Sequence, residues 1–141
     1  MIVKGYVGSM DVEETKKLAE NGIYVFNSKC IIGKEHLEYA YTKAKENFER
    51  GRNIANNFHI EIMLILTGRR QISTAIKLAG MDNADSFGAI SEEDFELDYE
   101  RDDSVLDCSE KKLRYLGIDI ELGEKSCDLA FENSALLELE R

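Results

Sequence analysis

Two adjacent arginines are the residues of this sequence whose type and spacing most suggest binding chemistry. Arg69 and Arg70 follow a glycine and stand at the start of an expected helix over residues 71–79. Cations there oppose the positive end of the helix dipole, but guanidinium groups beside free backbone N–H groups also form an anion site. Two interpretations stay open. The arginines either grip an anion or pair with carboxylates, such as that of Glu61 or those of the acidic segment 92–103.

Motifs for catalysis, nucleotide binding and metal binding are missing from the sequence. Gly33-Lys34 is followed by glutamate and lacks the first glycine of a P-loop. His36 and His59 lie 23 residues apart, with no carboxylate or cysteine at ligand spacing. We therefore expect both histidines to be helix residues, and we expect no cofactor and no metal. The missing motifs favour a binding protein over an enzyme.

The cysteines and the N-terminus indicate the compartment. Cys30, Cys108 and Cys127 are odd in number, widely spaced and without a Cys-x-x-Cys pair. They predict buried thiols in a reducing compartment, with neither a disulfide framework nor a zinc site. The chain begins with a strand-like pattern, no signal peptide is evident, and no run of about 18 apolar residues occurs. We expect a cytoplasmic protein with no membrane partner.

The net charge of −10 is distributed unevenly. Residues 1–81 contain 12 Lys+Arg and 9 Asp+Glu, whereas residues 82–141 contain 6 and 19. A uniformly acidic protein repels nucleic acid, but the mildly basic first half leaves room for a local phosphate-binding face. The densest acidic run is the segment 92–103. We expect it to be a solvated surface segment kept mobile by self-repulsion, with a docking patch for a basic partner as the alternative.

The pattern of elements predicts an α/β chain of the α+β type. The 141 residues are enough for one domain with a core of its own. Strands are expected at 2–7, 23–26, 87–90 and 137–140, and helices at 12–20, 34–50, 58–67, 71–79, 110–116 and 124–132. Together these elements predict a small mixed β-sheet packed by several helices, in a single domain over residues 1–141.

The helix over residues 58–67 is apolar on nearly every face, so it is expected to be buried on more than one side. Its neighbour carries isoleucines and alanines on one face. Any part of this surface that is exposed in the monomer is a candidate protein-binding patch, although a core helix with nothing left over is the simpler interpretation. The candidate partner contacts are Phe58, Ile62, Ile72 and Ile76.

Residues 56–80 carry a recognisable pattern. In order, they contain Asn56, Glu61, the apolar run 62–66, Thr67-Gly68, Gln71-Ile72, Ala75-Ile76 and Gly80. This pattern resembles the signature of the kinase-binding small subunit of the KEOPS tRNA-modification complex, the PRPK-binding protein family, in its archaeal form. The resemblance is strong over residues 34–81 and fair over 127–139. The acidic segment matches no family pattern.

The resemblance implies a non-catalytic subunit rather than an enzyme. KEOPS makes the threonylcarbamoyl modification on an adenosine of tRNA, and its catalytic subunit and kinase-like ATPase do the chemistry. The small subunit binds the ATPase and, in archaeal complexes, the 3′ CCA end of tRNA. The implied partners are therefore the kinase-like ATPase, tRNA and, indirectly, the other KEOPS subunits.

Positive charge in the basic half marks the candidate RNA contacts, which are Arg69, Arg70, Arg52, Lys43 and Lys77. The alternative function is a small phosphate- or nucleotide-using enzyme. In that enzyme Arg69 and Arg70 would grip the anion, and Glu61 would act as acid or base.

Overall fold

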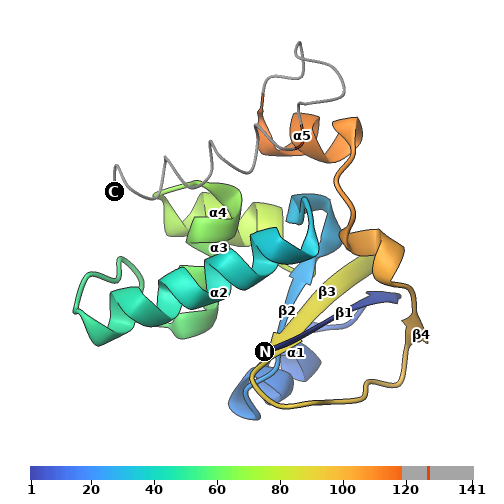
Figure 1. The fold of residues 1–141 in the computed structure, drawn as a ribbon, viewed down its shortest axis with the longest axis horizontal. Coiled ribbons are helices and arrows are strands. Elements are labelled where there is room, and N and C mark those ends of the chain that lie inside the picture. Colours follow the sequence, from blue (N-terminus) through green and yellow to red (C-terminus); the bar gives the residue numbers. More distant parts are fainter. Residues whose placement is uncertain (119–126, 128–141) are drawn as a thin grey trace.

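The structure is a computed structural model that describes residues 1–118 and Cys127. Within these residues the chain forms a four-stranded sheet and five α-helices (Figure 1). The strands are β1 (Ile2–Val7), β2 (Tyr24–Asn27), β3 (Ser86–Ser91) and β4 (Glu100–Arg101). The helices are α1 (Val12–Glu20), α2 (Lys34–Glu49), α3 (Phe58–Thr67), α4 (Ile72–Ala79) and α5 (Glu110–Leu116). Two short 3-10 turns, η1 (Ser28–Cys30) and η2 (Asp103–Leu106), complete the described elements.

The sheet has the strand order β2-β3-β1-β4. On β1, Ile2 lies opposite Ser91 and Val7 lies opposite Ser86. The α+β class is confirmed, but every described strand pair is antiparallel, whereas the expected sheet was mixed. The reason is that β3 lies between β1 and β2 and runs opposite to both. The short β4 was not predicted, and the helix and strand expected at 124–132 and 137–140 lie outside the described residues.

Helix boundaries follow the capping residues in the sequence. The side chains of Asp11, Asn57 and Ser109 cap α1, α3 and α5 by accepting a backbone N–H from the first turn. Gly68 and Gly117 end α3 and α5 in the left-handed conformation, which glycine adopts without a steric penalty. The predicted helices over residues 12–20, 34–50, 58–67, 71–79 and 110–116 are therefore confirmed to within a residue or so.

The core lies on both faces of the sheet, because successive side chains of a strand point to opposite faces. Phe26 and Ile90 pack with the helices α2, α3 and α4 on one face, and α3 is the central helix there. Val25 and Phe87 pack with Tyr6 and other side chains on the opposite face. Figure 1 shows α2, α3 and α4 grouped together on one side of the strands.

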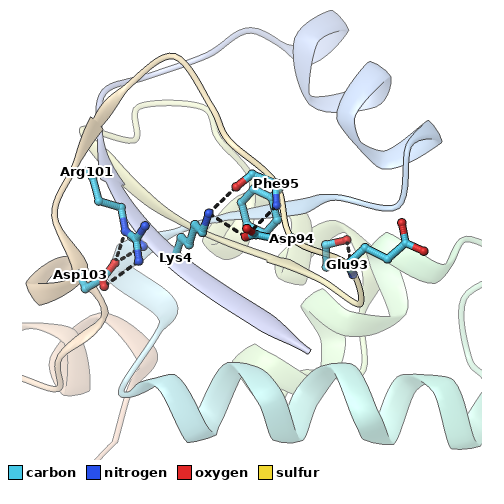
Figure 2. A network of polar contacts seen from close by, with 8 residues as sticks. Lys4, Glu93, Asp94, Phe95, Arg101 and Asp103 are labelled. Atoms are coloured by element: carbon cyan, nitrogen blue, oxygen red, sulfur yellow. Dashed lines mark hydrogen bonds and ion pairs between the residues drawn. The ribbon is translucent and has the colours of Figure 1, made fainter.

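The acidic segment 92–103 is tied to the sheet (Figure 2). Lys4 of β1 is buried, and its ammonium group donates to the carbonyl oxygen of Phe95 and lies 2.9 Å from the carboxylate of Asp94. The ring of Phe95 is buried as well, with the ammonium group 4.9 Å from its centre. Most residues of the segment are exposed, as expected. At Phe95 the expectation of a solvated segment is wrong, because a buried ring and a buried cation attach the segment to the sheet.

The cysteines correct a second expectation. Cys108 and Cys127 form a disulfide, with 6.0 Å between their Cα atoms and 19 residues between them in sequence. The prediction that the cysteines form no disulfide was wrong. Whether two cysteines can be bridged depends on the distance between them in the fold, and their spacing in the sequence did not show that distance. Cys30 is the free, buried thiol that was expected. None of the described helices combines the length and the apolar character that crossing a bilayer requires.

Candidate functional site

Glu61, the acid or base of the enzyme alternative, is fully buried in α3. Its carboxylate accepts hydrogen bonds from the side-chain amide of Asn47 and from the backbone N–H groups of Ile54 and Ala55, each at 3.0 Å. These contacts attach the loop between α2 and α3 to both helices. The geometry gives Glu61 a structural task, and the enzyme alternative loses the residue it relied on.

Among the described residues, Arg69 forms no ion pair with a carboxylate. Its side chain is half-buried, and one guanidinium nitrogen donates to the carbonyl oxygen of Leu116 at 2.8 Å. Leu116 is the last residue of α5, so the arginine places positive charge at the negative end of that helix. Arg70 is exposed and lies just before α4. The two arginines, adjacent in sequence, thus have different surroundings.

The remaining candidate RNA contacts are spread over the molecule. Lys77 is exposed in the last turn of α4, at the opposite end of this helix from Arg70, which precedes it. Arg52 is exposed in the loop that precedes α3, whereas Arg70 follows the end of α3. The ten residues of α3 span about 15 Å, which separates these two arginines. Lys43 lies on α2, half-buried and 3.6 Å from Glu46.

The candidate partner contacts also differ in their exposure. On α4, Ile72 and Ile76 are 39% and 41% exposed, whereas Ala75 and Ala79 on the inner face are buried. The isoleucines stand one turn apart, so they form one patch on the helix surface. Ile62 of α3 is fully buried in the core. The partner contact expected for Ile62 does not fit this burial, because the side chain offers no surface.

Phe58, the fourth apolar candidate, belongs to an aromatic cluster at the start of α3. Its ring meets those of Tyr24, Tyr41 and Phe48 edge-on, with centres 5.3, 5.4 and 5.6 Å away. Edge-to-face contacts of this kind stabilise the fold in addition to the gain from burying the apolar surface of the rings. Phe58 remains half-buried and borders an open groove of about 390 Å³ between α1 and α3. The clustering was not predicted, because it joins aromatic residues of β2, α2 and α3.

Both histidines lie in helices, as predicted. The ring of His36 accepts the backbone N–H of Ile32 at 3.2 Å, and burial lowers the pKa of His36 to about 4. His59 lies 2.9 Å from the carbonyl oxygen of Val25, and burial lowers its pKa as well. Each ring holds a neighbouring backbone group, and burial keeps both rings neutral at pH 7.

Comparison with known proteins places these features in a family. Residues 11–111 match the family described as kinase binding protein CGI-121. The chain is also similar to the regulatory protein Cgi121 of Methanocaldococcus jannaschii, with 31% identity over 122 residues, 82% of this chain and 81% of the relative. The family match includes α2, α3 and α4 and therefore the exposed isoleucines of α4. The chain belongs to the kinase binding protein CGI-121 family.

Proposed function

We propose that this protein is a non-catalytic, cytoplasmic subunit of a KEOPS complex. It binds the kinase-like ATPase subunit and recruits tRNA through the 3′ CCA end for threonylcarbamoyladenosine modification. The observation that carries the proposal is the exposed pair Ile72 and Ile76 on α4, within the region that matches a family named for kinase binding. The other KEOPS subunits are reached indirectly, through the kinase-like ATPase.

The apolar pair on α4 supplies the kinase contact. Each isoleucine side chain is about two-fifths exposed. Full burial of an exposed isoleucine is worth about 1.5–3 kcal/mol, so covering the remaining part of each gives roughly 1 kcal/mol. The pair together therefore contributes about 2 kcal/mol, or roughly thirtyfold in affinity.

Co-expression with the kinase-like ATPase tests this contact. The tagged wild-type chain is expected to retain the kinase, and the double variant Ile72→Gln/Ile76→Gln is expected to bind it at least tenfold more weakly. Glutamine keeps helix propensity, so α4 stays folded. Val12→Gln is the matched control, because Val12 is 56% exposed on α1. A double variant with wild-type folding and wild-type kinase affinity would place the contact elsewhere, and a wild-type chain that retains no kinase would remove the proposal.

The tRNA contact rests on the cations of α4. A single-stranded RNA end is bound by positive charge, and two exposed cations flank α4: Arg70 lies just before this helix and Lys77 lies in its last turn. Arg69 is a weaker candidate because its side chain is half-buried, whereas that of Arg70 is exposed. Arg52 and Lys43 remain predictions for contacts with other parts of the tRNA.

Salt dependence distinguishes phosphate-binding cations from structural arginines. For a single strand, the slope of log affinity against log salt falls by about 0.7 for every phosphate that the protein no longer neutralises. Arg70→Gln/Lys77→Gln is therefore expected to reduce the slope by about 1.4, whereas Lys17→Gln on α1 leaves it unchanged. Removing the CCA end from the tRNA should abolish most of the binding. Unchanged slope and affinity in a folded double variant would place the RNA site elsewhere.

The absence of catalysis is tested separately. The isolated chain should neither hydrolyse ATP nor modify tRNA, and it should raise the activity of the other subunits when added to them. Turnover by the isolated chain that disappears in Glu61→Gln would restore the enzyme alternative.

A further inference from the structure

Two hydrogen bonds connect α5 to the two ends of α4. The last four carbonyl groups of an α-helix have no partner within the helix. In α4, the carbonyl oxygen of Leu78 accepts the hydroxyl group of Tyr115, a residue of α5, at 2.7 Å. In α5, the carbonyl oxygen of Leu116 accepts a guanidinium N–H of Arg69, which lies just before α4, at 2.8 Å. A change in the position of α5 therefore reaches α4 at both of its ends.

The order of α5 depends on its contacts with the rest of the protein. The helix has seven residues, and a helix of this length is not stable in isolation. It packs against η1, and α4 packs against η1 as well. Directly after α5, a Cβ atom on Gly117 would lie 3.2 Å from a guanidinium nitrogen of Arg69, so this contact is close. Loss of any one attachment makes local opening of α5 more frequent.

The disulfide attaches the opposite end of α5. Cys108 lies directly before Ser109, the N-cap of α5, and its partner Cys127 packs against the main core. The bond closes a loop that contains α5, so it limits the conformations that α5 can reach when its other contacts break. Both cysteines are half-buried rather than fully buried. A disulfide that is partly open to solvent is easier to reduce than one in the core.

We propose that the Cys108–Cys127 disulfide is a redox switch that acts through α5 on α4. In reduction, two molecules of a small thiol become one disulfide, and the protein disulfide becomes two thiols. In the reduced chain α5 opens more often, and the carbonyl group of Leu78 then loses the hydroxyl of Tyr115. Because α4 carries the exposed isoleucine pair, reduction weakens binding of the kinase-like ATPase. This last step rests on the proposed function. Disulfides of cytosolic proteins are usually transient, catalytic or redox-sensing, which agrees with the proposed compartment.

Hydrogen exchange of the full chain, with and without dithiothreitol, tests the connection in the absence of the kinase. Reduction is expected to speed exchange on the order of tenfold in α5 and severalfold in the last turn of α4, because opening of α5 becomes more frequent. Helix α1, which packs on β2, is the internal reference and should not change. Cys108→Ser should exchange like the reduced wild type, with or without dithiothreitol.

Tyr115→Phe separates the hydrogen bond from the disulfide. The variant keeps the ring and removes only the hydroxyl that donates to Leu78. In the oxidised chain, exchange in the last turn of α4 is expected to rise roughly three- to tenfold. Tyr99→Phe is the matched control, because it removes a hydroxyl that is bonded to Glu14 of α1. Unchanged α4 exchange in either the reduced wild type or Tyr115→Phe, or an equal rise in the control, would overturn the proposal.

Affinity for the kinase-like ATPase is then measured with the same proteins. The oxidised wild type is expected to bind severalfold more tightly than the reduced wild type. Cys108→Ser should bind weakly under both conditions, which excludes an effect of dithiothreitol on the kinase itself. If α4 exchange responds to reduction but kinase affinity does not, the switch is refuted. If α4 exchange responds and the oxidised chain binds no kinase at all, the proposed function fails, while the connection between the disulfide and α4 stands.

Discussion

The buried carboxylate of Glu61 permits a prediction with a magnitude. In Glu61→Ala, the side-chain amide of Asn47 and the backbone N–H of Ala55 lose their acceptor inside the core, whereas the N–H of Ile54 lies at the edge of the loop. Each of these two hydrogen bonds to a buried charged group contributes about 1.5–3 kcal/mol. The expected loss in the free energy of unfolding is therefore about 4 kcal/mol. The free energy of unfolding of a domain is typically about 5–15 kcal/mol, so the variant loses a large part of its total stability.

Glu61→Gln is the matched comparison. Its side-chain oxygen still accepts from both backbone N–H groups, and the amide of Asn47 can rotate to accept from the glutamine nitrogen, so the loss should stay near 1 kcal/mol. Urea denaturation followed by circular dichroism gives the free energy of unfolding of both variants, from the midpoint and the slope of the transition. If Glu61→Ala unfolds within about 1 kcal/mol of the wild type, the carboxylate does not hold the loop, and the reasoning is refuted.

Three further predictions concern stability. The pKa of His36 is about 4 in the fold and 6.5 in the unfolded chain, so the free energy of unfolding should fall by about 3 kcal/mol from pH 6.5 to pH 4. His36→Asn should make the free energy of unfolding depend less on pH. A wild-type free energy of unfolding that does not change over this pH range contradicts the prediction. Reducing the disulfide, which spans 19 residues, should lower the free energy of unfolding by about 3 kcal/mol, and Cys108→Ser should abolish the effect of the reductant. Phe95→Ala should cost about 3 kcal/mol by urea denaturation, with the exposed Glu93→Ala as a neutral control; a similar cost in both variants would argue against a specific anchor.

Features governed by local chemistry could be predicted from the sequence. Asp11 and Asn57 accept N–H groups three residues ahead, and Gly68 ends its helix because its own backbone turns left-handed. Each of these interactions lies within a few residues of chain, so the helix positions follow from the pattern alone. Helical periodicity placed the isoleucines and alanines of α4 on one face, but it did not predict that Ile72 and Ile76 would be exposed while Ala75 is buried.

Interactions between distant residues could not be predicted in this way. Lys4 contacts Phe95 across 91 residues, and Arg69 contacts Leu116 across 47. Neither pair has a local signature, because a lysine in a strand and an arginine before a helix are ordinary surface residues. Tertiary packing decides their partners. The same holds for Glu61, whose periodic position placed it in a helix but gave no sign that the neighbouring loop would supply its donors.

The pairing of β1 with β3 has a consequence for synthesis of the chain. Val7 pairs with Ser86, so β1 leaves the ribosome 79 residues before its partner strand. At about 5–20 residues per second, that interval is roughly 4–16 s. The helices α2, α3 and α4 lie between the two strands in sequence and contact one another locally, so they can form during this time. Strand β1 is thus made before these helices but paired after them, and its apolar side chains need protection, by the nascent helices or by a chaperone, until β3 emerges.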